Sequence, residues 1–87
     1  MAKYEIVKVT WHDAHAENEW QEISQIDSEP FVVVTVGWLI PNVKPNHVVV
    51  AQSIGADDAL DGVLSIPSGM VVSKEPLSVA NEQLFIQ

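Results

Sequence analysis

The sequence lacks cysteine and is poor in positive charge. Its 87 residues contain no Cys and only four Lys or Arg against 12 Asp or Glu, which gives a formal net charge of −8. Without Cys, disulfides and thiolate-based metal sites or nucleophiles are excluded. The four cations, Lys3, Lys8, Lys44 and Lys74, are scattered along the chain. Because neutralising phosphates takes clustered cations, we expect no direct nucleic-acid binding.

Long apolar runs are also missing. No run approaches the ~20 residues that a membrane span needs. Residues 1–11 alternate polar and apolar side chains, unlike the apolar block of a signal peptide. We therefore expect a cytoplasmic protein with no membrane partner.

The length of the chain predicts one domain over residues 1–87. A chain this short buries only ~60–65% of its unfolded surface, so we expect modest stability unless subunits share a core. The core is expected at about residues 4–77. The tail 78–87 either docks on a neighbouring copy or frays.

The 26-residue stretch from Phe31 to Ala56, FVVVTVGWLIPNVKPNHVVVAQSIGA, contains no acidic residue. Two apolar runs flank a turn rich in Pro and Asn, which predicts strands over 31–40 and 47–54. The first run is apolar on both faces and contains Gly37, which is typical of a bent strand that another strand approaches closely.

Three further strands are predicted, at residues 4–11, 63–66 and 70–74, with Val7, Val9 and Trp11 on one face of the first. A Ser-capped turn is expected at Ser24–Asp27. The fold class is mainly β: a small five-stranded Sm-like or Tudor-like barrel with at most one short helical turn. The alternative is another five-stranded meander or a half-open sandwich.

Acidic residues concentrate in two places. Six lie within 17 residues, Asp13, Glu17, Glu19, Glu22, Asp27 and Glu29, and three more are Asp57, Asp58 and Asp61. One interpretation is that they provide solubility. The other is an acidic face for a basic partner, which could imitate DNA.

No catalytic constellation stands out. His12, Asp13, His15 and Glu17 form the only local group of metal-ligand types, and their spacing matches no established metal motif. His47 heads a strand and is expected on the solvent side. We therefore predict no metal site, no cofactor and no enzymatic activity.

Three tryptophans are many for so small a chain, and at least two are expected in the core or in subunit contacts. The alternative is a ligand pocket in which aromatic rings stack on a planar ligand and neutral side chains donate hydrogen bonds. The residues predicted for that pocket are Trp11, Trp38, Asn42, Asn46, Gln52 and Ser53. Only Lys8, Lys44 and Lys74 could then meet phosphates.

Four motifs occur in order: Trp11-x-Asp13-Ala14, Val36-Gly37-Trp38-Leu39, Val49-Val50-Ala51-Gln52-Ser53 and Ile66-Pro67. Together they resemble a group of small proteins encoded in tailed-phage and prophage genomes. The resemblance covers about residues 5–77. It implies a phage accessory protein that acts inside a bacterial host, and it carries no site residues with it.

Three functional hypotheses follow. The first is a homo-oligomeric binding protein that counters host defence by sequestering a nucleotide-type immune signal. The second is an acidic interaction module that inhibits a host protein. The third, and the weakest, is a metal-dependent hydrolase using His12, Asp13 and His15.

Overall fold

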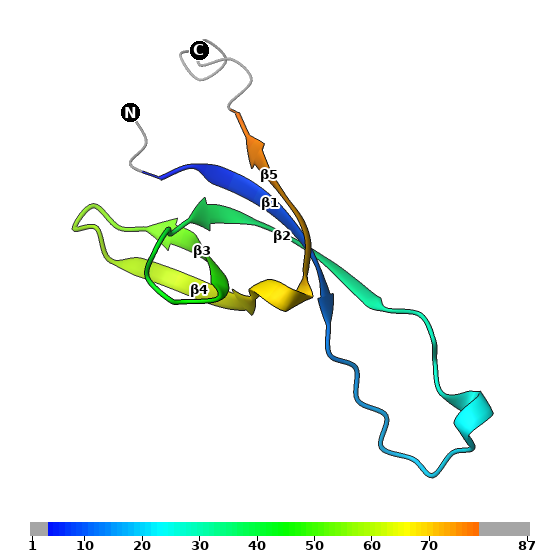
Figure 1. Ribbon diagram of the computed structural model, residues 1–87. Helices are drawn as coiled ribbons and strands as arrows, with labels where there is room; N and C mark the ends of the chain where they lie inside the picture. Colours follow the sequence, from blue (N-terminus) through cyan, green and yellow to red (C-terminus); the bar gives the residue numbers. More distant parts are fainter. Residues whose placement is uncertain (1–3, 79–87) are drawn as a thin grey trace, which may run out of the picture.

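The computed structural model describes residues 4–78, which form five strands (Figure 1). The strands are β1 (Ile6–Asp13), β2 (Phe31–Leu39), β3 (His47–Ile54), β4 (Leu60–Pro67) and β5 (Val71–Leu77). Two short 3₁₀ turns, η1 (Ile23–Gln25) and η2 (Ser68–Met70), are the only helical segments of this part of the chain. None of its helices has the length and apolar character to cross a membrane.

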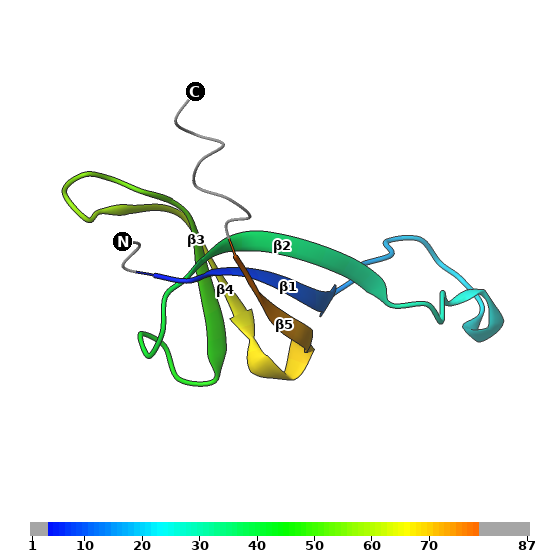
Figure 2. The same ribbon diagram turned by 90° about the horizontal axis from the view of Figure 1, so that it is seen from above.

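The strands form one antiparallel sheet in the order β4-β3-β2-β1-β5. The mainly-β prediction is confirmed. Closure into a barrel stays a prediction, because within residues 4–78 the edge strands β4 and β5 form no ladder with each other. The sheet is instead strongly curled, with η2 linking its two edge strands (Figure 2).

Two details of the prediction are wrong. The described residues contain two helical turns rather than at most one. The first covers Ile23–Gln25 rather than starting at Ser24. It is capped by the side chain of Gln25, whose Oε1 accepts the Glu22 backbone N–H at 2.7 Å. A side chain reaching back from the end of the turn has taken the place of the expected serine cap.

Small clusters of apolar side chains lie on both faces of the sheet. The inner cluster contains Val7, Val9, Trp11, Val50 and Ile66. The outer cluster contains Ile40, Val49 and Ala51, with Tyr4 and Trp38 packed against it. Successive β3 residues therefore serve opposite faces, as the alternation of strand side chains requires.

Gly37 is the point at which β2 changes its neighbours. Residues Phe31 to Trp38 pair with β1, whereas only Trp38 and Leu39 pair with β3. A Cβ placed on Gly37 would lie 2.8 Å from the Ala51 backbone carbonyl oxygen. The predicted close approach is confirmed, since only a residue without a side chain lets β3 come this near.

Beyond Gly37 the sheet splits. The Gln52 side chain donates from Nε2 to the Val36 carbonyl at 3.0 Å, where a continuous sheet would have a backbone donor. Because β5 pairs with β1 as far as Trp11, only His12–Asp13 of β1 and Phe31–Val32 of β2 run on as a two-stranded ribbon. The ribbon leads into residues 14–30, which we call the arm (Figures 1 and 2).

The arm projects from the sheet, and all of its residues are exposed. The Cα radius of gyration is 17.2 Å, against about 12 Å for a compact chain of this length. The arm carries three strongly exposed apolar side chains, Trp20, Ile23 and Ile26. These side chains contribute nothing to the core of the single chain.

The close approach at Gly37 makes Gly37→Ala a test of the fold. The added methyl meets a backbone oxygen, which cannot rotate away, so we expect the free energy of unfolding to fall by about 1–3 kcal/mol. Gly69→Ala is the matched control, because nothing lies within 4 Å of its added Cβ. Urea denaturation of both variants checks this; equal stabilities would contradict the role given to Gly37.

Candidate functional site

The two tryptophans predicted to line a pocket lie on opposite faces of the sheet. Trp11 is 9% exposed and belongs to the inner cluster. Its indole N–H donates to Thr35 Oγ1 at 3.0 Å. Trp38 packs against the outer cluster. The two rings therefore do not face one cavity in a single chain.

Gln52 and Ser53 lie near the far end of β3 and are both exposed. The Gln52 amide nitrogen is occupied by the Val36 carbonyl, and Ser53 lies opposite Asp61 on β4. Neither residue lines the depressions in which the predicted asparagines are found. Their part in a ligand site stays a prediction.

Asn42 and Asn46 come together in the turn between β2 and β3. Both have a φ of 60°, in the left-handed region that asparagine tolerates better than most residues. The Asn46 carbonyl also accepts the Ser68 backbone N–H at 2.9 Å, which ties this turn to η2. The backbone of both residues thus shapes the turn, while their side chains are exposed.

Two adjoining depressions meet at this turn, and together we call them the mouth. Asn42 and His47 line both of them. Lys74 and the apolar residues Leu39, Ile40, Pro41, Val48 and Val49 complete the first depression. Lys44, Pro45, Asn46 and Ser68 complete the second.

The mouth gathers two of the chain's four Lys and Arg residues. Lys44 comes from the turn and Lys74 from β5, 30 positions later. No acidic side chain lines either depression. In a chain of net charge −8, this is a surface of locally positive character on which an anion would not meet a carboxylate.

His47 lines both depressions, whereas Lys74 lines only the first and Lys44 only the second. Its Nδ1 lies 2.8 Å from the Pro45 carbonyl oxygen. A carbonyl only accepts, so Nδ1 carries the proton and donates. This leaves Nε2 as the ring atom available to a ligand, as an acceptor in the neutral ring and as a donor in the protonated ring.

Sequence reasoning identified Asn42 and Asn46 and named Lys44 and Lys74, with Lys8, as the cations that could meet phosphates, but it placed His47 on the solvent side. The position of His47 directly after Asn46 was a signal that could have included it in the site. Lys74 gave no such signal, because only the curl of the sheet brings β5 to the turn.

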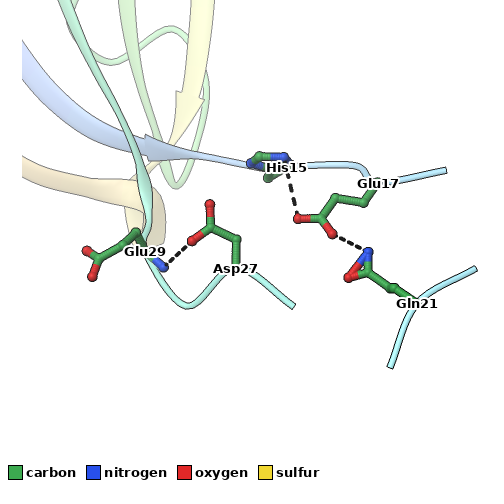
Figure 3. A network of polar contacts seen from close by, with 5 residues as sticks. All are labelled: His15, Glu17, Gln21, Asp27 and Glu29. Atoms are coloured by element: carbon green, nitrogen blue, oxygen red, sulfur yellow. Dashed lines mark hydrogen bonds and ion pairs between the residues drawn. The ribbon is translucent and has the colours of Figure 1, made fainter. Parts of the chain in front are cut away.

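The arm carries a second, acidic surface (Figure 3). His15 Nε2 lies 3.8 Å from Glu17 Oε1, and the Gln21 side chain donates to the other oxygen of Glu17. The Asp27 carboxylate accepts the Glu29 backbone N–H at 2.9 Å. A depression here is lined by His15, Glu17, Glu19, Gln21, Ile26, Asp27 and Glu29. The lining thus contains four carboxylates and one apolar side chain, that of Ile26.

The local group of metal-ligand residue types, His12, Asp13, His15 and Glu17, is divided between β1 and the arm. His12 and Asp13 end β1, whereas His15 is in the arm, where its ring contacts Phe31 edge-on at 6.4 Å. Within residues 4–78 no three His, Cys, Asp or Glu side chains are arranged to hold a metal ion.

Comparison with known proteins gave no match among family models, curated protein sequences or solved structures. A function for this chain therefore has to be argued from its own surfaces.

Substitutions at Asn46 separate its backbone role from its side chain. Asn46→Ala places an ordinary residue at a φ of 60° and should lower the free energy of unfolding by about 1–2 kcal/mol. Asn46→Gly removes the same amide without this strain and should change it by less. Chemical denaturation distinguishes the two. Equal losses in both variants would show that the amide, rather than the backbone, stabilises the turn.

Proposed function

We propose that this chain is a non-catalytic binding protein that sequesters a nucleotide-type anion at the mouth. The observation that supports this is the meeting of Lys44, Lys74 and His47 with two asparagines on a surface free of acidic side chains. A few convergent polar groups in a concave site lined by apolar side chains are typical of small-ligand sites. The proposal moves the site away from Trp11 and Trp38.

The residues of the mouth suit the parts of such a ligand. The ammonium groups of Lys44 and Lys74 flank the depressions and would meet phosphate oxygens from two sides. His47 Nε2 would add a further hydrogen bond between them. The amides of Asn42 and Asn46 can both donate and accept, which matches the edges of a base or a ribose.

The biological setting comes from the phage resemblance alone. In an infected bacterium, a nucleotide-type signal of host defence is removed as effectively by tight binding as by hydrolysis. Binding alone requires the protein in excess of the signal. A homo-oligomer that presents several mouths would serve this purpose.

The test is the double variant Lys44→Gln with Lys74→Gln. Each charge-assisted hydrogen bond contributes roughly 1.5–3 kcal/mol, so losing both should weaken nucleotide binding by roughly 100-fold or more. Isothermal titration calorimetry with a panel of cyclic and linear nucleotides measures this. Lys44→Gln and Lys74→Gln are also measured singly, and Lys8→Gln is their matched control, since it removes one positive charge from β1, away from the mouth.

Two results would contradict the proposal. One is an absence of heat with every nucleotide of the panel. The other is an equal loss of affinity in Lys8→Gln and in each mouth variant, which would indicate general charge attraction rather than a site.

A second candidate function is an acidic module that binds a basic surface of a host protein. It is favoured by the arm, which carries five of the 12 acidic residues beside the exposed Trp20, Ile23 and Ile26. Apolar anchors with a charged rim are a usual composition of protein interfaces. Such an interface would be strongly dependent on salt.

This candidate predicts salt-sensitive capture of a basic protein from bacterial lysate. Changing Glu17, Glu19 and Glu29 together to Gln should weaken capture roughly 3- to 150-fold, since each exposed charge pair contributes about 0.2–1 kcal/mol. Changing Asp57, Asp58 and Asp61 to Asn removes three charges elsewhere and should leave capture intact. Empty pull-downs at low ionic strength would exclude this candidate.

A further inference from the structure

The N-terminal half of β2 has an open edge. The Leu39 backbone N–H bonds to the Glu5 carbonyl on the β1 side, whereas the Val36 carbonyl is bonded by Gln52 on the β3 side. Backbone groups of a strand point alternately to its two sides. Even-numbered residues of β2 therefore direct their N–H and C=O groups away from β1.

For Val32 and Val34 no strand lies on that side. The β2–β3 ladder consists of Trp38 and Leu39 alone. Among residues 4–78, the backbone groups of these two valines have no hydrogen-bond partner. They form a short template for a further strand.

The side chains at this edge are also uncovered. Val32, Val34 and Val36 are 51%, 57% and 46% exposed and form an apolar stripe on the outer face of β2. The segment from Phe31 to Val36 contains no charged residue and no proline. Exposed edge strands of this composition associate unless something covers them.

The other open edges of the sheet are protected. The edge strand β4 contains Asp61 and the left-handed Gly62, which has a φ of 65°, and it ends in Pro67. The edge strand β5 carries Lys74, Glu75 and Pro76. Charges, kinks and prolines are the usual devices that prevent edge pairing. Only the β2 edge lacks them in the part of the chain that the structure describes.

We propose that the β2 edge pairs with the same edge of a second copy of this chain. Antiparallel pairing about a two-fold axis at Val33 places Val32 of each copy opposite Val34 of the other. Both residues offer free N–H and C=O groups, so the edge is complementary to itself. The neutral segments do not repel each other, although each chain carries a net charge of −8.

The arm completes this interface. The edge valines and Phe31 alone fall short of the roughly 800 Å² that each partner buries in a stable complex. The arm joins β2 at Phe31, and antiparallel pairing leads it past Val36 onto the body of the other copy. Trp20, exposed as fully as in an extended chain, would add roughly 200 Å² there. Its carboxylates would remain on the outside of the dimer.

The test compares Val34→Lys with Val72→Lys by light scattering coupled to size exclusion. Val72, at 58% exposed on β5, matches Val34 in size and exposure. The unmodified chain should have the mass of a dimer or of a multiple of it. Val34→Lys should shift the mass toward one chain, with a dissociation constant raised at least tenfold, whereas Val72→Lys should leave it unchanged.

Val34→Pro is a second, independent variant. The proline removes only the N–H that faces the open edge and leaves the β1–β2 ladder intact, so it should also dissociate the dimer while preserving the far-ultraviolet circular dichroism. The proposal is overturned if the unmodified chain is a monomer at high micromolar concentration. It is equally overturned if Val34→Lys and folded Val34→Pro remain dimeric.

Discussion

The close contact between Gly37 and the Ala51 carbonyl oxygen determines the form of this molecule. Because β3 crosses β2 there at backbone distance, it can pair with β2 only briefly and then diverges. The crossing buries Ala51, and it gives the inner and outer faces of the sheet separate apolar clusters. It also leaves the remainder of β2 paired on one side alone. A continuous β2–β3 ladder would have covered the valine edge and removed the ribbon that carries the arm.

The strands were predictable because their signals are local. Alternation placed Val7, Val9 and Trp11 on one buried face, and the bent β2 with its glycine was expected from its two apolar faces. The register between strands was not predictable in the same way. Trp11 lies opposite Val33, whose side chain is on the other face of β2 from Trp38. A shift of the pairing by one residue would place Trp11 opposite Val32 or Val34, on the face of Trp38. A slip of one residue reverses every face, so no reading of single strands could decide whether the two rings share a pocket.

Only the part of the mouth that is local in the sequence was predictable. Asn42 and Asn46 belong to a turn whose composition marks it in the sequence, and Lys44 and His47 lie within the same few residues. Lys74 reaches the mouth only through the curl of the sheet. The sequence indicated that the arm is polar and acidic, but it did not indicate that the arm projects from the sheet. Trp20, Ile23 and Ile26 are exposed there, whereas such side chains are usually buried.

The distribution of charge allows these surfaces to act separately. Four of the five acidic residues of the arm line its depressions, and none of the five lines the mouth. At physiological ionic strength exposed charges are screened over about 8 Å. The molecule is 57 Å long, and the arm projects from its sheet, so two lysines can present a local positive field on a strongly acidic protein. In the proposed dimer, the uncharged segment Phe31–Val36 would meet its copy without like charges opposing the contact. A net charge of −8 is therefore compatible with anion binding at the mouth, because no carboxylate lines its two depressions.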